Sequence, residues 1–380
     1  MRIVIVIDSF KGSLSSIQAG NAVKEAACMV DPSVETVICP LADGGEGTVD
    51  ALVVGPNCQI INMKVSGPQK KPVDAKYVIL DNGTAVIEMA QAAGLTLVPC
   101  DERNPMETTT YGVGELIRDA IKRGCRHFIV GIGGSATNDG GVGMLIALGY
   151  AFTDKNGKNI DLGAKGLQEL ASISDANVMP ELKECVFRVA CDVTNPLCGD
   201  NGCSAVFAKQ KGATEEMIAD MDRWLNNYAQ IAKEVSASAD ANYPGAGAAG
   251  GLGFAFLSFL RASLESGTKI IIEETGIEKH IQGADLVITG EGRLDSQTVM
   301  GKAPIGIAKL AKKYGKKVIA FCGCATDDAV LCNAHGIDAY FPIIRGITTL
   351  DEALNVDNAH KNLVATAYQV FHLLLADKSN

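Results

Sequence analysis

The N-terminal segment changes from an unbroken apolar run to a helical pattern of apolar positions. Residues 2–8, RIVIVID, are apolar on both faces, which is typical of a parallel strand covered on both sides. Ser15 and Gln18 then have the spacing of a helix capping box. The apolar positions that follow at helical spacing are Ala19, Ala22, Val23, Ala26, Ala27 and Val30. The pattern predicts a strand and a helix, and VETVICP, residues 34–40, predicts the next strand.

The C-terminal third repeats this alternation. ADLVITG, residues 284–290, and KKVIAFCG, residues 316–323, each predict a strand. Between them, a helix is predicted over Pro304–Tyr314, because a proline stands near its start and Gly315 follows its end. The apolar positions that mark a last helix are Leu363, Ala367, Val370, Phe371 and Leu374. Strand–helix units with short loops favour right-handed crossovers and a doubly wound parallel sheet of the Rossmann type.

The middle of the chain has a different pattern of predicted elements. Residues 74–90, DAKYVIL-DNG-TAVIEMA, predict a β-hairpin with an Asp-Asn-Gly turn. A helix is expected over 114–122, followed by the strand HFIVG at 127–131 and later by FRVACDV at 187–193. The glycine-rich stretch 244–253 opens onto an apolar helix.

These patterns together predict an α/β protein with two α/β domains. The first is a Rossmann-like doubly wound parallel sheet built from both termini, residues 1–65 plus 286–380. The second is an α/β domain inserted at 66–285.

The composition of the chain limits which kinds of partner it can bind and indicates its cellular compartment. The net charge is −10 with pI near 5.1, which disfavours nucleic acid and anionic membranes. Residues 241–260 carry no charge, but their Gly, Ala and Pro content favours a buried helix over a membrane span. The 12 cysteines are scattered without a Cys-x-x-Cys pair, and the apolar N-terminal stretch is too short for a signal peptide. We therefore expect buried thiols in a cytoplasmic protein.

Five loops at the predicted carboxyl ends of strands share the same kinds of residue, a carboxylate beside glycines or hydroxyls. They are DSFKGS (8–13), DGGEGT (43–48), GGSATNDGG (133–141), CDVTNP (191–196) and GEGRLDSQT (290–298). Any one of them could be ordinary turn chemistry. Because ligands of open α/β sheets bind beyond the carboxyl ends of the strands, five such loops predict a ligand site.

The loop at 133–141 has the features of an anion site. Its glycines allow close backbone approach, and a helix starting near Gly141 adds a positive dipole end, so phosphate is expected. Asp139 fits if Mg²⁺ bridges it to phosphates. None of the five histidines lies in these loops, so acid–base work falls to Asp or Glu. The residues thus indicate a phosphotransferase that uses ATP and Mg²⁺ on a small hydroxylated substrate.

Two other functions stay open at this level. Gly131-Ile-Gly-Gly-Ser-Ala136 also fits a loose Gly-x-Gly-x-x-Ala pattern, which is compatible with an NAD(P)-dependent dehydrogenase of a small hydroxy acid. The third hypothesis is a non-catalytic sensor of a nucleotide or a sugar acid. Gathering so many carboxylates without chemistry for them to perform would cost stability, which disfavours the sensor.

Six ordered motifs resemble those of the bacterial-type (class I) glycerate kinase family. They are IDSFKGSLS, PLADGGEGTVDAL, GIGGSATNDGGVGMLIALG, ACDVTNPLCG, PGAGAAGGLG and ITGEGRLDSQTVMGKAP, and they span nearly the whole chain. The resemblance implies phosphorylation of D-glycerate by ATP with Mg²⁺, giving 2-phosphoglycerate rather than 3-phosphoglycerate. It also implies a site in the cleft between two α/β domains, in a monomer or homodimer. Two departures are Ile7, where the family has Pro, and Ala208-Lys-Gln-Lys-Gly212, where it has Gly-Pro-Gln-Lys-Gly; the second puts any role of Gln210 or Lys211 in doubt.

Matching the motifs gives each candidate residue a role. The implied catalytic residues are Asp192 as general base, Lys11 and Asp295. The implied substrate-binding residues are Ser9, Asp43, Glu46, Arg293 and Gln297. The implied nucleotide-binding residues are Gly133, Gly134, Ser135, Thr137 and Asn138, and the implied metal ligands are Asp139 and Glu291. The competing interpretations are a turn or cap aspartate for Asp192, a solvated Lys11, and strand–helix packing for the glycine loop.

Overall fold

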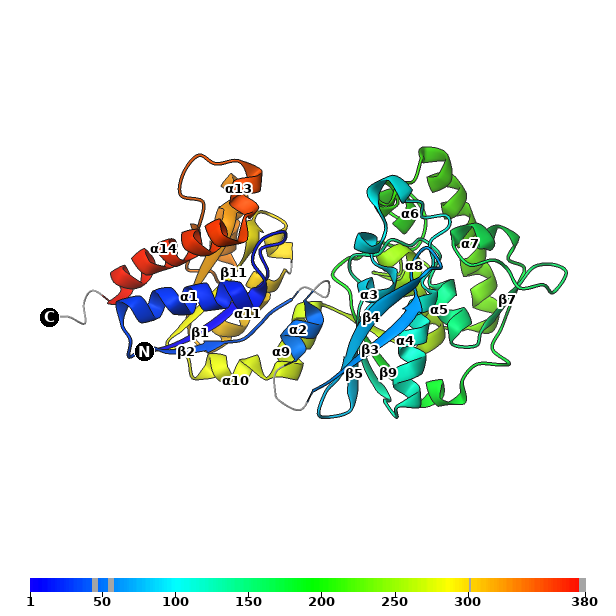
Figure 1. Cartoon of the computed structure of the whole chain (residues 1–380), viewed down its shortest axis with the longest axis horizontal. Helices are drawn as coiled ribbons and strands as arrows, with labels where there is room; N and C mark the ends of the chain where they lie inside the picture. The colour runs from blue at the N-terminus through cyan, green and yellow to red at the C-terminus, as the bar shows by residue number, and fades with distance from the viewer. Residues whose placement is uncertain (43–46, 54–57, 301, 376–380) are drawn as a thin grey trace. The chain divides into compact units, whose positions relative to one another are not determined.

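The computed structural model describes residues 1–42, 47–53, 58–300 and 302–375 (Figure 1). The chain divides into two compact units, each with its own sheet. Unit 1 comprises Met1–Asp43, Asp50–Leu52 and Thr268–Asn380. Unit 2 comprises Gly44–Val49 and Val53–Gly267.

Unit 1 is built on a parallel sheet to which both ends of the chain contribute. Its strand order is β13-β12-β11-β1-β2. The strands are β1 (Arg2–Ile7), β2 (Glu35–Ile38), β11 (Leu286–Leu294), β12 (Lys317–Ala325) and β13 (Ala339–Pro342). The order runs outward in opposite directions from the β1–β11 pair, so the sheet has a topological switch point there. This arrangement confirms the predicted Rossmann-like parallel sheet.

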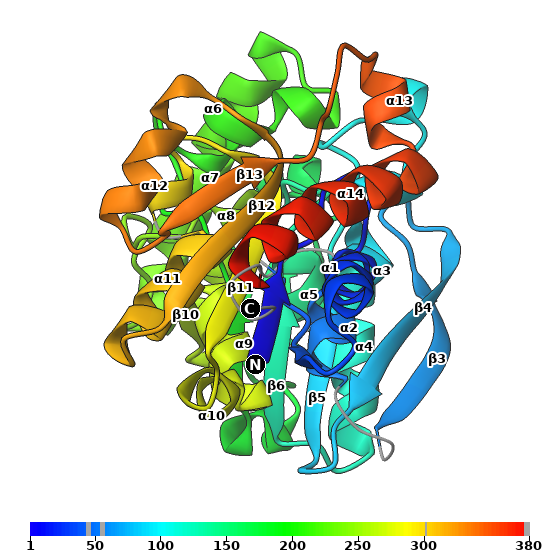
Figure 2. The same ribbon diagram turned by 90° about the vertical axis from the view of Figure 1, so that its left-hand side faces the viewer.

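Helices cover both faces of the sheet in unit 1. On one face, α1 and α14 pack side by side, as Figure 2 shows, with α1 against β1 and β2 and α14 against β12. On the other face, α11 packs against β11 and β12. The helices of this unit are α1 (Ser16–Val30), α9 (Gly267–Thr275), α10 (Ile277–Gln282), α11 (Ala303–Lys313), α12 (Leu331–Ala334), α13 (Leu350–Leu354) and α14 (Val356–Leu375). The predicted capping box is present, because Gln18 N donates to Ser15 Oγ at 3.2 Å and Ser15 N donates to Gln18 Oε1 at 2.8 Å.

Unit 2 contains a mixed sheet with the order β10-β9-β6-β5-β4-β3. The strands β5, β6, β9 and β10 run parallel, whereas β4 and β3 are antiparallel to their neighbours. The bounds are β3 (Gln59–Ser66), β4 (Pro72–Ile79), β5 (Thr84–Glu88), β6 (His127–Gly131), β9 (Val186–Ala190) and β10 (Ser263–Glu265). A separate pair is formed by β7 (Ala151–Thr153) and β8 (Ser172–Ser174). The β4–β5 pairing confirms the predicted hairpin.

The helices of unit 2 pack around one apolar core. They are α3 (Ala90–Ala93), α4 (Tyr111–Lys122), α5 (Val142–Ala147), α6 (Cys203–Phe207), α7 (Glu215–Val235) and α8 (Ala248–Leu260). The short α2 (Thr48–Leu52) contains the residues at which the chain passes from one unit to the other. The 3-10 turns are η1 (Leu95–Leu97), η2 (Cys100–Glu102), η3 (Ala164–Glu169), η4 (Pro180–Glu184), η5 (Lys209–Lys211), η6 (Thr298–Met300) and η7 (Asp327–Val330).

The two units differ in their limits from the predicted domains, 1–65 plus 286–380 and 66–285. Strand β3, which the prediction placed in the first domain, pairs with β4 along its whole length, from Gln59 opposite Ile79 to Ser66 opposite Pro72. This ladder holds the strand in unit 2. At the other boundary, the helices α9 and α10 precede the predicted start at 286 but belong to unit 1 from Thr268 onward.

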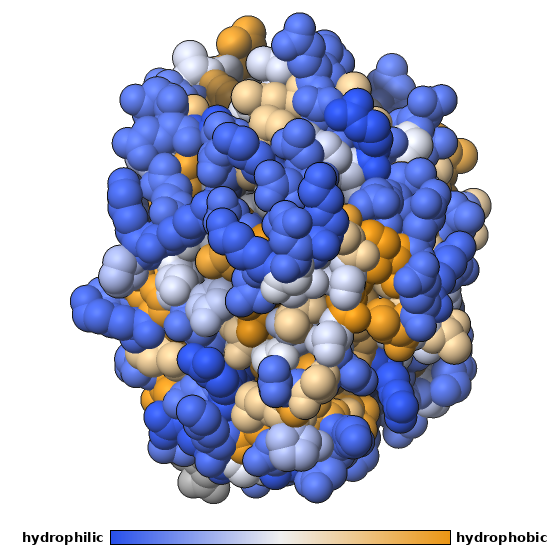
Figure 3. Space-filling model, turned by 90° about the vertical axis from the view of Figure 1, so that its right-hand side faces the viewer, coloured by the Kyte–Doolittle hydropathy of each residue, from blue (hydrophilic) through white to orange (hydrophobic). Residues whose placement is uncertain are grey.

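The uncharged stretch at 241–260 is an internal packing element. Within α8, Leu252, Phe254, Ala255 and Phe256 are completely buried, as the sequence predicted. In the described part of the chain, no helix has both the length and the apolarity to cross a membrane. The face in Figure 3 is largely hydrophilic and carries its hydrophobic residues in small groups.

Candidate functional site

The loop after β1 starts at the switch point of unit 1. Asp8 is buried, and its backbone N–H donates to Gly290 O on β11 at 2.9 Å. The N–H of Ser9 donates to Asp8 Oδ1 at 2.7 Å, which closes a tight turn. Ser9 is half-buried, and Lys11 extends from the turn with its surface exposed. The strand end therefore presents the serine and the lysine near the carboxyl end of β11.

Glu291, at the carboxyl end of β11, is 9% exposed, and its carboxylate contacts one hydroxyl group and one ammonium group. Its Oε1 accepts from Thr298 Oγ1 at 2.7 Å, and its Oε2 lies 3.6 Å from Lys302 Nζ. Burial raises the pKa of Glu291, whereas the Thr298 hydroxyl and the Lys302 ammonium lower it. The carboxylate is thus desolvated and held in place by short contacts.

The next residues form a turn around Asp295. Its Oδ1 accepts from the N–H of Gln297 at 3.0 Å, and its Oδ2 lies 3.4 Å from Arg293 Nε. Lys302 Nζ is 3.9 Å from Asp295 Oδ1, so one ammonium lies near two carboxylates, those of Asp295 and Glu291. Arg293 and Gln297 are both exposed.

The two carboxylates fit the ligand chemistry of Mg²⁺. In phosphate-transferring sites Mg²⁺ usually takes one or two carboxylates, completed by phosphate oxygens and water. Glu291 and Asp295 supply such oxygens at one strand end. Within residues 1–42, 47–53, 58–300 and 302–375, no group of three or more His, Cys, Asp or Glu residues is arranged to hold a metal.

Two predicted substrate-binding residues, Asp43 and Glu46, lie outside the described residues.

In unit 2, the glycine-rich loop after β6 presents unpaired backbone donors. Gly134 is exposed with φ +75°, and Gly133 is half-buried. Among the described residues, the N–H groups of these two glycines donate to no protein acceptor. The loop itself is fixed, because Leu95 N donates to Gly134 O at 2.8 Å and Ala136 N donates to Ala93 O at 2.9 Å. A fixed loop with unpaired backbone N–H groups at its surface fits a phosphate.

The polar side chains of the same loop point inward. Thr137 and Asn138 are completely buried, and Asn138 Nδ2 donates to Ser204 Oγ on α6 at 2.8 Å. Ser135 is 8% exposed and sits at the boundary between the buried and the open part of the loop. The predicted nucleotide-binding residues thus fall into two groups. Gly133, Gly134 and Ser135 lie at or near the surface of the loop, whereas Thr137 and Asn138 are buried beneath it.

Asp139 has the environment of a structural carboxylate. It is completely buried, and its Oδ2 accepts from Thr110 N at 2.8 Å, Thr110 Oγ1 at 2.9 Å, and more distantly Thr109 Oγ1 and Gly143 N, both at 3.3 Å. Its Oδ1 accepts from Gly141 N at 3.1 Å. Burial raises the pKa of Asp139, and these hydrogen bonds lower it. Because no face of the carboxylate is open, the geometry does not fit the metal-ligand role predicted for Asp139.

The stretch PGAGAAGGLG supports the glycine loop by close packing. Ala249, Gly250 and Gly251 have left-handed backbone conformations at the start of α8. A Cβ at Gly250 would lie 2.1 Å from Thr137 O, and Gly140 N donates to Gly250 O at 2.9 Å. Two glycine-rich segments far apart in the sequence therefore interlock, and a side chain at Gly250 would force them apart.

Asp192 follows β9, which pairs with β6, so it lies at the same sheet edge as the glycine loop. Its side chain is exposed, and its Oδ1 accepts from Gly267 N at 3.3 Å. The prediction of an accessible carboxylate at this edge thus has a matching geometry in unit 2.

Lys211, whose role the departure from the family motif put in doubt, is a further buried charge. Its Nζ donates to Ser135 Oγ at 2.8 Å and to Thr137 O at 2.7 Å. Lys302 and Thr298, the partners of Glu291, were also not predicted. Their polar surroundings in the sequence resemble any surface turn, so no pattern distinguished these residues from solvated ones.

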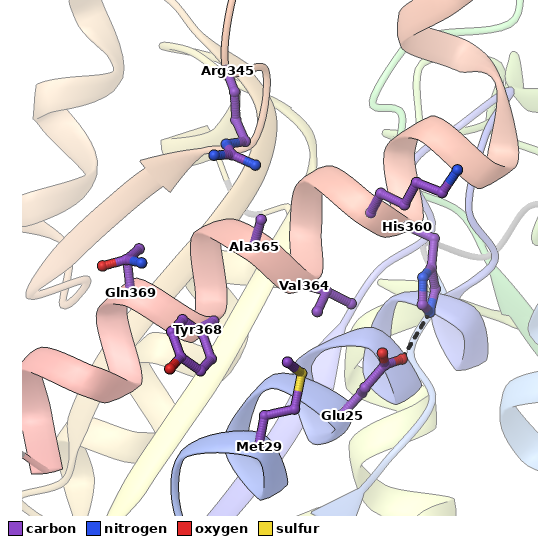
Figure 4. A pocket seen from close by; sticks show the side chains of 9 residues that line it. Glu25, Met29, Arg345, His360, Val364, Ala365, Tyr368 and Gln369 are labelled. Atoms are coloured by element: carbon purple, nitrogen blue, oxygen red, sulfur yellow. Dashed lines mark ion pairs between the residues drawn. The ribbon is translucent and has the colours of Figure 1, made fainter.

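The structure of unit 1 also contains a hollow. It has a volume of about 340 Å³ and is lined by α1, α14 and Arg345 (Figure 4). His360 Nε2 lies 3.5 Å from Glu25 Oε2 at its edge. None of the predicted site residues is among the residues that line it.

A family model, curated relatives and a solved structure all match this chain to the same class of protein. The glycerate kinase family model matches residues 3–375. A glycerate 2-kinase of Escherichia coli K12 is 47% identical over 96% of this chain and 98% of its own length. A glycerate kinase of Bacillus subtilis 168 is 48% identical over 93% of both chains. A crystal structure assigned as glycerate kinase 2 from Salmonella typhimurium LT2 has a TM-score of 0.87 and 44% identity, covering 100% of this chain and 99% of that one.

The α/β fold and these matches define the chain as a phosphotransferase. More specifically, it belongs to the glycerate kinase family. The resemblance stated from the six motifs is confirmed, and membership of a kinase family disfavours the dehydrogenase alternative.

Proposed function

We propose that this protein is an ATP-dependent glycerate kinase that uses Mg²⁺ and phosphorylates the 2-hydroxyl of D-glycerate. The observation that carries the proposal is the fixed loop after β6, in which the N–H groups of the half-buried Gly133 and the exposed Gly134 donate to no acceptor among the described residues. A relative that is 47% identical over nearly the whole chain is named glycerate 2-kinase, which supports the position of attack.

The nucleotide phosphates are proposed to bind at this loop. Backbone N–H groups at φ-positive glycines and the hydroxyl of Ser135 would donate to phosphate oxygens, as in other anion sites. Gly134 must stay a glycine for this, because its φ of +75° is strained for any side chain.

In unit 1, Glu291 is proposed to hold Mg²⁺, with Asp295 beside it. When bound, the metal supplies positive charge to the phosphate oxygens. Lys302 offsets part of the negative charge of the two carboxylates. Lys11 is proposed to bind the substrate carboxylate as a point charge, and Ser9, Arg293 and Gln297 are proposed to contact the substrate.

Asp192 is proposed as the general base. Its exposed carboxylate would accept the proton of the glycerate hydroxyl as that oxygen attacks the γ-phosphorus of ATP. The bond to the ADP oxygen then breaks, and ADP leaves with the bonding electrons.

The direct test is ADP release from Mg-ATP with D-glycerate, with L-glycerate and lactate as controls, and ³¹P NMR of the product. We expect D-glycerate-dependent ADP and one signal, that of 2-phosphoglycerate. Absence of ADP with folded protein would contradict the kinase, and a 3-phosphoglycerate signal would contradict the position.

Metal removal gives a second prediction. An excess of EDTA should abolish ADP release, and added Mg²⁺ should restore it. The Glu291→Gln variant should need a higher Mg²⁺ concentration for half-maximal rate, because it lacks one ligand charge. Unchanged activity in EDTA would contradict the metal.

We also propose that the protein acts in the cytoplasm on small molecules alone, as a monomer or homodimer. The net charge of −10 supports the absence of nucleic-acid and membrane partners. Light scattering coupled to size exclusion measures the oligomer directly, and a mass above that of two chains would contradict this proposal.

A further inference from the structure

Lys211 is turned into the interior of unit 2 at the end of η5. It is 2% exposed, whereas Lys209, two residues earlier, is on the surface with Glu215. The turn is tight, since Gly212 has φ +94° and a Cβ there would lie 2.2 Å from Arg103 O. Burial of an ammonium is unfavourable unless hydrogen-bond acceptors replace the lost water, so the contacts of Lys211 explain its position.

The contacts of Lys211 fix the donor and acceptor roles of Ser135. An ammonium has three donors and no acceptor, so Ser135 Oγ accepts the bond of 2.8 Å from Lys211 Nζ. The proton of Ser135 must then be directed elsewhere. Among the described residues the Ser135 hydroxyl has no protein acceptor, and it lies beside the exposed Gly134.

We infer that Lys211 is a positioning residue that orients the Ser135 hydroxyl as a hydrogen-bond donor toward an anionic phosphate. This inference rests on the proposed function, because the phosphate is that of the nucleotide proposed at this loop. The bond from Lys211 to Thr137 O, at 2.7 Å, holds the loop backbone in the same arrangement.

The same geometry makes the hydroxyl sensitive to the charge of Lys211. A neutral amine can accept a hydrogen bond, so Ser135 could turn its proton inward and lose the phosphate. Burial lowers the pKa of Lys211 to about 8, although the nearby Cys203 thiol and Asp139 carboxyl raise it. Nucleotide affinity should therefore fall as pH rises through about 8.

The other titratable or charged groups around Lys211 are Cys203, Asp139 and Arg103. Cys203 on α6 is buried, and burial raises its pKa to about 11, above this range. Burial raises the pKa of Asp139 and its hydrogen bonds lower it, and Arg103 donates from Nη1 to Gln210 O at 3.5 Å. Lys211 is the group whose pKa of about 8 lies within the range. The pH step is thus assigned to the lysine.

The test is the dissociation constant of the Mg²⁺ complex of a non-hydrolysable ATP analogue, measured by calorimetry from pH 7 to pH 9.5, with KM and kcat for ATP alongside. For wild type we expect affinity to weaken on the order of tenfold across the step, with KM rising more than kcat falls. Lys211→Met and Ser135→Ala should bind weakly at all pH values and show no step. Lys209→Met and Cys203→Ala, the matched controls, should keep it.

The possible results distinguish failure of the inference from failure of the proposed function. A wild-type affinity that does not change with pH, with intact nucleotide binding, would overturn the inference alone. So would a Ser135→Ala variant whose affinity falls with pH as in wild type. If Lys211→Met fails to fold, Ser135→Ala still tests the inference. Folded wild type that neither binds the analogue nor releases ADP with glycerate would overturn the proposed function and the inference with it.

Discussion

The two aspartates at one edge of the unit 2 sheet differ in their surroundings, and this difference is the basis of the roles that we propose for them. Asp139 is completely buried and accepts from three backbone N–H groups. Asp192 is exposed, with Gly267 N as a donor at 3.3 Å. A buried carboxylate surrounded by donors organises the backbone, whereas an exposed one can exchange a proton with a substrate.

Replacing Asp139 should destabilise the fold in a graded way. Asp139→Ala leaves the N–H groups of Thr110, Gly141 and Gly143 without their acceptor, which should lower the free energy of unfolding by about 3–5 kcal/mol. Asp139→Asn should cost less, because its amide oxygen can replace Oδ2. Urea unfolding measures both, with the exposed Asp74→Ala as control. Wild-type stability of Asp139→Ala together with a higher Mg²⁺ concentration for half-maximal rate would restore the metal role.

Replacing Asp192 should affect the rate and leave the fold intact. The amide of Asp192→Asn keeps an acceptor for Gly267 N but cannot take a proton, so kcat should fall by about 10²–10⁴. Asp200→Asn, an exposed neighbour in the same loop, is the control. A kcat near wild type would remove Asp192 from the mechanism and leave the kinase assignment standing.

At the residue scale, the sequence predicted the backbone conformation of the glycine-rich loop better than the burial of its side chains. The glycines of the 133–141 loop were predicted for close approach, and Gly134 has the positive φ that this requires. The burial of Thr137, Asn138 and Lys211 was not predicted, because it depends on α6, α8 and η5, which meet the loop only in the folded unit.

At the scale of elements, the packing of α4 against α5 depends on a glycine. A Cβ at Gly114 would lie 2.4 Å from Met144 O and 2.7 Å from Ala147 Cβ, so the two helices touch with no room for a methyl group. Gly114→Ala should lower the free energy of unfolding by about 1–3 kcal/mol despite the better helix propensity of alanine. Gly346→Ala, which meets nothing within 4 Å, is the control. Equal urea midpoints for the two variants would contradict this packing.

Elements with a strong local pattern were predicted well. The run RIVIVI is β1, Ser15 and Gln18 form the capping box, and Asp81-Asn-Gly83 connects β4 to β5. Strand β3 was not recognised, because only Ile61 and Val65 along it are fully buried and the rest of its pattern is irregular. Its assignment follows from the ladder with β4, a pairing that no local window contains.

At the scale of the whole molecule, unit 2 is nearly continuous in sequence. It has its own core, which includes Phe128, Tyr228 and Phe254. We expect a fragment covering residues 44–267 to fold alone, because the sheet and helices of unit 2 all lie within it. Circular dichroism and a cooperative urea transition measure this. A fragment without a cooperative transition would show that unit 2 needs the rest of the chain.

The sheet of unit 1 has a consequence for biosynthesis. Strand β1 pairs with β11, and the bond from Arg2 N to Asp285 Oδ2 spans 283 residues. At ribosomal speeds of about 5–20 residues per second, β1 waits roughly 15–60 s for that partner. During this interval unit 2 emerges complete, while the apolar N-terminal strand is still without its central neighbour. Nascent chains of this protein should therefore carry a folded middle and an N-terminal segment that chaperones can bind.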